Sequence, residues 1–99
     1  MTISDQNKKF IQSLIDYYVS EPQAYTEIVQ AYSPISELAE TTVGFVIGMI
    51  YSGFLRAYAD QGLEIKSDDI DEFNSVVRDN TAKIRKAFSN TEILTKKNS

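Results

Sequence analysis

Two pairs of carboxylates, each three residues apart, are the clearest candidates for chemistry in this sequence of 99 residues. Glu37 and Glu40 open one predicted helix, and Asp69 and Glu72 open the next. Side chains at positions i and i+3 share a helix face, so each pair could offer oxygen ligands to Mg²⁺. Both pairs also lie in first turns, where the helix dipole favours negative charge. Helix stabilisation is therefore the simpler interpretation, and a metal site is the alternative.

The four carboxylates resemble the acidic pattern with which all-α nucleotide pyrophosphohydrolases hold Mg²⁺. The resemblance covers these four residues alone and implies an Mg²⁺-dependent hydrolase with Glu37, Glu40, Asp69 and Glu72 as ligands. The sequence lacks the further acidic residue that usually precedes the first pair, and no basic cluster lies nearby to bind phosphates. We therefore expect no metal and no other cofactor, and keep the hydrolase as an alternative function.

The composition removes several other classes of site. The chain contains neither histidine nor cysteine, which excludes His-dependent triads, His-ligated metals, thiolate nucleophiles and disulfides. The lack of cysteine fits a reducing compartment, and we expect a cytoplasmic protein. A net charge of −4 disfavours binding to a nucleic acid backbone, which requires a basic face. An enzyme is consequently less favoured than a binding protein.

Helical periodicity and capping residues predict an all-α fold with four helices. The first predicted helix starts after Ser4 and covers residues 5–19, the second has Pro22 in its first turn and covers residues 21–32, and the third covers residues 34–61. A fourth helix is expected to be capped by Ser67 and carries Phe88 on its inner stripe. Gly62 is expected to end the third helix in the left-handed conformation, with Leu63 folding back on the last turn. Residues 1–90 are predicted to form one domain, and residues 91–99 a flexible tail.

The third predicted helix is long and apolar, because no charged residue lies between Glu40 and Arg56. The 15 uncharged residues of this stretch include three glycines, and a membrane span needs about 20 predominantly apolar residues. A helix that is apolar on all sides must be covered on all sides. We therefore expect a central helix wrapped by three amphipathic helices, and no membrane association. The apolar run at residues 10–15 is likewise too short for a signal peptide.

Small residues form a stripe along this central helix. Gly44, Gly48 and Ser52 follow one another at intervals of four residues. Glycine in a helix interior costs about 0.8–1 kcal/mol relative to alanine, so two on one face suggest that another backbone approaches there. That backbone belongs either to another helix of the same chain or to the same helix of a second copy. Gly53 lies off the stripe and has no separate explanation.

Tyrosines recur at intervals of seven, as Tyr25 and Tyr32 on the second helix and Tyr51 and Tyr58 on the third. Each pair shares a helix face, which suits a core stripe with hydroxyl groups at its rim, or an interface. The predicted partner-binding residues are accordingly Gly44, Gly48, Ser52, Tyr51 and Tyr58.

Residues 60–72 hold six acidic residues and a single lysine. This segment is expected to be a solvated helix start or a docking patch for a basic protein partner. Arg56 is expected to extend into solvent or to pair with Asp60. The sequence as a whole favours a non-enzymatic interaction protein (an adaptor, regulator or inhibitor) that forms a homodimer. The alternatives are the hydrolase and a carrier of an apolar ligand with a tyrosine-lined interior.

Overall fold

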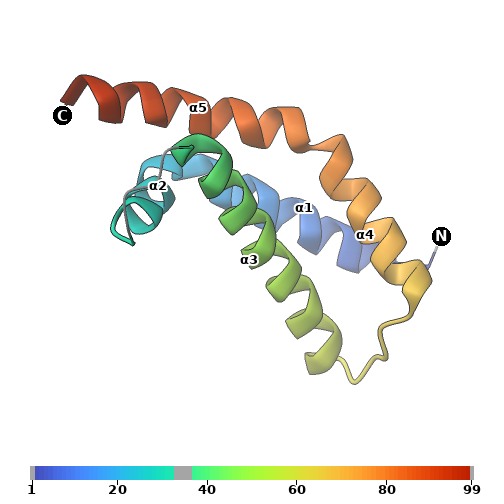
Figure 1. Cartoon of the computed structure of the whole chain (residues 1–99). Coiled ribbons are helices and arrows are strands. Elements are labelled where there is room, and N and C mark those ends of the chain that lie inside the picture. The colour runs from blue at the N-terminus through green and yellow to red at the C-terminus, as the bar shows by residue number, and fades with distance from the viewer. Residues whose placement is uncertain (1, 33–36, 99) are drawn as a thin grey trace.

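The computed structural model describes residues 2–32 and 37–98, with side chains described as far as Ser89. The described residues contain five α-helices: α1 (Asp5–Ser20), α2 (Pro22–Gln30), α3 (Leu38–Asp60), α4 (Ser67–Asp79) and α5 (Thr81–Asn98) (Figure 1). The prediction of an all-α fold is confirmed for this part of the chain. The predicted count of four helices is wrong, because the segment expected to be the last helix is divided into two.

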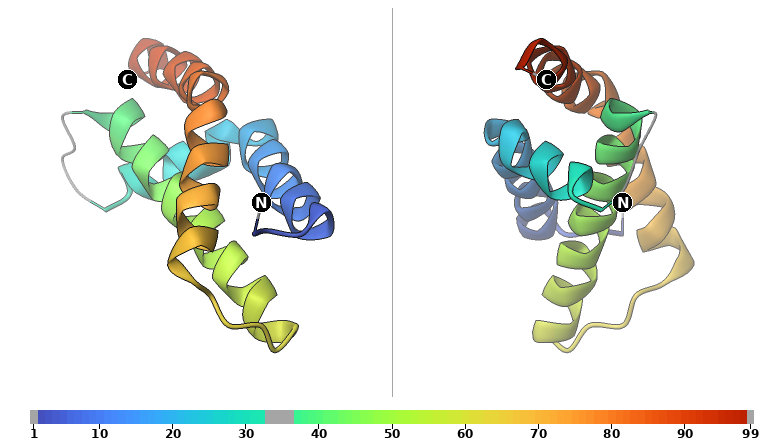
Figure 2. Two further views of the ribbon diagram at one scale, coloured as in Figure 1. Left: turned by 90° about the vertical axis from the view of Figure 1, so that its right-hand side faces the viewer. Right: turned by 60° about the vertical axis from the view of Figure 1, so that its left-hand side comes forward.

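The division between α4 and α5 lies at Asn80. Its side-chain amide donates to the Val76 carbonyl at 2.8 Å and to Gln12 Oε1 of α1 at 3.4 Å. Asparagine competes in this way with the regular hydrogen bonds of a helix, and such competition favours helix ends. Figure 2 shows the result as a bent rod in which α5 continues at an angle to α4. Periodicity alone did not reveal the bend, since Phe73, Val77, Ile84 and Phe88 are buried on both sides of it.

Most of the expected helix ends are present. The Ser4 hydroxyl caps α1 by accepting from the Asn7 N–H at 3.1 Å, and Pro22 occupies the first turn of α2. Gly62 has a φ of 68°, and Leu63 N–H bonds back to the Tyr58 carbonyl at 2.9 Å, so α3 ends as predicted. The predicted start of this helix at Pro34 lies outside the described residues.

The start of α4 differs from what the sequence led us to expect, and α5 extends over residues that were expected to form a flexible tail. Ser67 is the first residue of α4 rather than its cap, and the start of this helix is secured instead by Asp69, which accepts from the Lys66 N–H at 3.0 Å. The backbone of α5 is helical to Asn98. The expected flexibility of residues 91–99 concerns motion and stays a prediction.

The core lies where α3 packs against α1, α2 and α5. It is filled by large side chains that are less than 2 % exposed, among them Ile11, Ile15, Ile50, Phe54, Phe73, Ile84 and Phe88. Phe73 brings α4 into this core by stacking on Phe54, with ring centroids 4.7 Å apart. The inner face of α2 is formed by Tyr25, Thr26 and Val29. Ile28 on its outer side is 42 % exposed, and Tyr32, which follows the helix and was expected to share a face with Tyr25, is 75 % exposed.

Helix α3 is not covered on all sides by the other described helices. Val43, Val46, Ile50 and Phe54 form its buried face, whereas Gly44, Gly48 and Ser52 are exposed on another face. Figures 1 and 2 show α3 reaching past the other helices towards the loop that leads to α4. The uncovered face is tolerated in water because the residues that it presents are small rather than large and apolar.

Candidate interaction site

The carboxylate pairs at Glu37/Glu40 and Asp69/Glu72 are not brought together. Because α3 and α4 are consecutive and joined by a short loop, the first turn of α4 lies nearer to the last turn of α3 than to its first turn (Figure 1). Glu40 pairs with Arg85 of α5 at 3.1 Å, and Glu37 is exposed. Within residues 2–32 and 37–89, no three acidic side chains are placed to hold a metal ion. The structure thus supplies none of the geometry that the pyrophosphohydrolase pattern implies.

The second pair instead fixes the N-terminal segment against α4. Glu72 accepts the backbone N–H groups of Thr2 and Ile3, both at 3.1 Å, and pairs with Lys8 at 3.3 Å. Burial raises the pKa of Glu72, but these donors outweigh that effect and hold its pKa below the ordinary value. Hydrogen bonds from the Thr2 side chain and the Lys66 backbone likewise lower the pKa of Asp69. Both carboxylates therefore stabilise the fold as anions.

The three glycines within α3 have different surroundings. A Cβ atom built on Gly44 or on Gly48 would meet no neighbouring part of the chain within 4 Å, and both residues are exposed. A Cβ atom on Gly53 would lie 2.8 Å from Leu14 Cδ1 of α1. The close approach within the chain is therefore made at Gly53, the glycine that the stripe did not include. Gly44 and Gly48 serve no packing contact among the described residues.

An apolar groove of about 440 Å³ runs between α3 and α4 beside these two glycines. Gly44 and Gly48 line one side of it with Ile47 and Tyr51, and α4 contributes the other wall, formed by Ile70, Phe73 and Asn74. None of these side chains carries a charge. Such a groove fits the apolar face of a helix, and the glycines would allow the backbone of that helix to come close.

The tyrosines divide between this groove and the interior. Tyr51 is half-buried at the groove, where its ring packs edge-on against Phe73 with centroids 5.3 Å apart. Tyr58 is only 4 % exposed and packs on Phe54 with centroids 4.9 Å apart. Burial, together with the neighbouring Asp69 carboxylate, raises the pKa of Tyr58, so its hydroxyl remains protonated. Of the five predicted partner-binding residues, Gly44, Gly48, Ser52 and Tyr51 reach the surface, while Tyr58 fills the core.

The acidic segment presents several carboxylates that the fold does not use. Asp60, Glu64, Asp68 and Asp71 take part in none of the ion pairs that the described residues form, which join Lys8 to Glu72, Lys83 to Asp16 and Arg85 to Glu40. Of the two alternatives expected for Arg56, the pair with Asp60 is not formed, and the residue is exposed, as the other alternative requires. This end of the molecule is therefore negatively charged and free to meet solvent or a basic partner.

Among the described helices, α3 alone has the length and composition of a membrane span, with a third of its most apolar window buried inside the fold. The apolar core helix of a water-soluble protein meets the same criteria. The buried side of α3 already packs on α1, α2 and α5, and the exposed side carries Gly44, Gly48 and Ser52 rather than large apolar residues.

Comparisons with known proteins add no family to this description. No protein-family model matches the chain, and neither the curated proteins nor the solved structures include a significant match.

Proposed function

We propose that this chain is a non-enzymatic interaction protein that forms a homodimer through the groove between α3 and α4. The observation that carries the proposal is the exposure of Gly44 and Gly48 in the middle of a 23-residue helix. Each glycine costs the helix about 0.8–1 kcal/mol relative to alanine. Nothing in the described part of the chain comes close enough to use the space that a missing Cβ provides. A second backbone seated there would use it.

A two-fold axis near Gly48 would bring α3 of each copy against the groove of the other. In the antiparallel arrangement, Gly44 of one copy lies level with Ser52 of the other, so small residues face small residues. The Glu40 end of one helix also lies beside the Arg56 end of its counterpart, and opposite charges meet. A parallel arrangement would instead place like charges at the same level. Charge complementarity therefore favours the antiparallel dimer.

The dimer can be tested by sedimentation equilibrium between about 5 and 500 µM, a range that covers the Kd values of weak to moderate dimers. The expected wild-type result is a mass approaching twice 11.2 kDa as concentration rises. Gly48→Leu should return the mass to that of the monomer, because the new side chain fills the groove floor and separates the helices. Ala82→Leu is a matched control, since Ala82 is exposed on α5.

Circular dichroism should confirm that both variants remain helical. If Gly48→Leu aggregates, Gly48→Ala provides the same test with a smaller side chain. A wild-type mass that stays at 11.2 kDa throughout would contradict the dimer. Equal loss of association in Gly48→Leu and Ala82→Leu would contradict the assignment of the face.

A further inference from the structure

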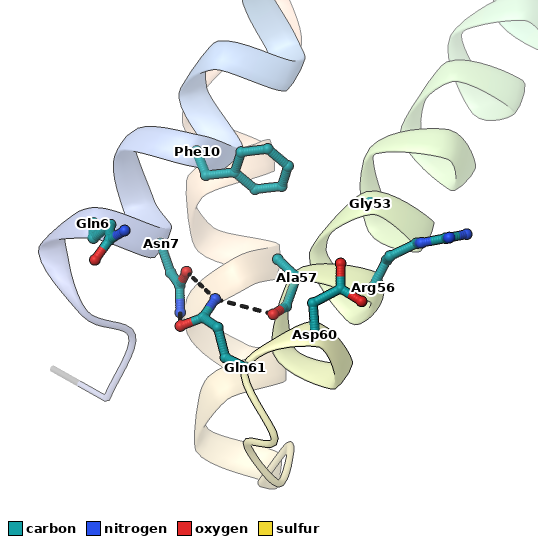
Figure 3. A pocket seen from close by; sticks show the side chains of 8 residues that line it. All are labelled: Gln6, Asn7, Phe10, Gly53, Arg56, Ala57, Asp60 and Gln61. Carbon is teal, nitrogen blue, oxygen red and sulfur yellow. Dashed lines mark hydrogen bonds between the residues drawn. The ribbon is translucent and has the colours of Figure 1, made fainter.

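A second cleft lies on another side of α3, between its C-terminal half and the N-terminal half of α1 (Figure 3). Its volume is about 400 Å³, which is within the range of sites that bind small groups. One wall is formed by Gln6, Asn7 and Phe10 of α1, and the other by Gly53, Arg56, Ala57, Asp60 and Gln61. Because Ala57 is small, the Phe10 ring faces open space across the cleft and is 40 % exposed.

Asp60 and Gln61 keep acceptor capacity in this cleft, whereas the Gln61 amide hydrogens are already used. Gln61 Nε2 donates to Asn7 Oδ1 at 2.8 Å and to the Ala57 carbonyl at 3.0 Å, which uses both of its hydrogens. Gln61 Oε1 receives only one long bond, of 3.5 Å, from the buried Asn7 amide. The Asp60 carboxylate makes no hydrogen bond or ion pair with any residue that the structure describes. Acceptor capacity is therefore left at Asp60 and Gln61.

An unpaired carboxylate, an amide oxygen and the face of an aromatic ring are complementary to an organic cation. The small Ala57 side chain leaves room for an apolar stem opposite the Phe10 ring, whereas the Cβ position of Gly53 is already taken by Leu14. Arg56 also lines the cleft, and Figure 3 shows its guanidinium extending away from Phe10, while the Asp60 carboxylate lies beside Ala57. The exposed acids Glu64 and Asp68 nearby would attract a basic surface.

We propose that this cleft receives a lysine side chain presented by a basic protein partner. The methylene stem lies along Ala57, and the ammonium group lies between the Asp60 carboxylate and the Phe10 ring. Lysine fits because its donors are compact and its stem is apolar. The site does not require the dimer, since the cleft and the groove between α3 and α4 have no lining residue in common.

The test is a titration of ¹⁵N-labelled protein with Nα-acetyl-lysine-N-methylamide, followed by amide chemical shifts. Saturable shifts are expected at Gly53, Ala57 and Gln61. The norleucine analogue, which keeps an apolar stem and lacks the ammonium group, should not produce them. Asp60→Asn should weaken binding about fivefold, the size expected for an exposed ion pair. Phe10→Leu should also weaken it, because leucine retains bulk without a ring face.

Asp71→Asn is the matched control, because it removes the same charge from the acidic segment outside the cleft. Its effect on binding should be less than twofold if the cleft is the site. The proposal is overturned if Asp60→Asn and Asp71→Asn weaken binding equally, since that would indicate general attraction. It is also overturned if the lysine analogue causes no saturable shifts at these three amides, or if the norleucine analogue causes the same ones.

Discussion

Replacing Gly44 and Gly48 by alanine should stabilise the monomer and weaken its association. Both positions are exposed within α3, and a Cβ atom at either would meet no neighbouring part of the chain within 4 Å. Each substitution should therefore add the full difference in helix propensity, about 0.8–1 kcal/mol. The double variant should gain about 2 kcal/mol, because the two sites share no packing partner in the monomer.

The effect can be measured by thermal unfolding at concentrations where sedimentation shows monomer. For a domain of this size, each kcal/mol should raise Tm by about 4–8 °C. Gly53→Ala is the internal comparison, since its Cβ would lie 2.8 Å from Leu14 Cδ1 and the Leu14 side chain must move. Its gain should be smaller than that at either exposed glycine, and it should change the association little.

The essential result is that the alanine substitutions raise the stability of the monomer and weaken its association. The two methyl groups hold a second helix away from the groove floor, so the dimer should dissociate at a higher concentration than that of the wild type. A monomer destabilised by Gly44→Ala or Gly48→Ala would refute the reasoning, because it would show that the chain uses these glycines internally. Unchanged association of the double variant would show that the glycine face is not where copies meet.

Two further predictions concern the fold. Phe73→Ala and Ile84→Ala should each lower the free energy of unfolding by about 2–5 kcal/mol, because both side chains are at most 1 % exposed. Asp71→Ala changes an exposed residue and should lower it far less. Chemical denaturation measures all three variants, and similar losses would contradict the assigned core. Stability should also fall on acidification below about pH 4–5, because the native pKa values of Asp16, Asp69 and Glu72 are lower than those in the unfolded chain. The stability that such a carboxylate contributes is fully present when the pH is above its pKa in the unfolded chain. It is lost as the pH falls through its lower pKa in the folded protein. Unfolding followed from pH 6 to pH 3 should show a shallower loss in Glu72→Gln than in the wild type, and an identical slope would exclude Glu72 as a contributor.

The helices were predictable from the sequence where one local rule decided the outcome. Ser4 caps α1, Pro22 begins α2, and Gly62 ends α3, because each residue satisfies a requirement set by its immediate neighbours. The break at Asn80 was missed because its amide bonds to Gln12 of a different helix as well as to its own backbone. A polar residue between two apolar stripes gives no sequence signal that distinguishes a solvent-facing position from a bend.

The carboxylates show why residue spacing alone did not locate a site. Glu37/Glu40 and Asp69/Glu72 have equivalent spacing, yet the first pair lies at the N-terminal end of α3 and the second lies in α4, beyond the C-terminal end of α3. The partners of Glu72 are backbone N–H groups of Thr2 and Ile3, about seventy positions away in sequence. Long-range backbone donors have no residue-type signature, so this role could be found only from the fold.

A glycine pattern in a sequence does not say which surface of a helix needs the missing side chains, and the glycines of α3 show why. A glycine in a helix shows that a missing side chain is tolerated or required, but not which surface requires it. The interval of four singled out Gly44 and Gly48 and set Gly53 aside, whereas α1 approaches α3 at Gly53, where Leu14 occupies the space of a Cβ atom. The regular spacing therefore does not report packing inside the monomer. It marks a continuous face one residue wide, beside the apolar wall of Ile70 and Phe73, and a continuous face is what a second helix needs if it is to lie along the first.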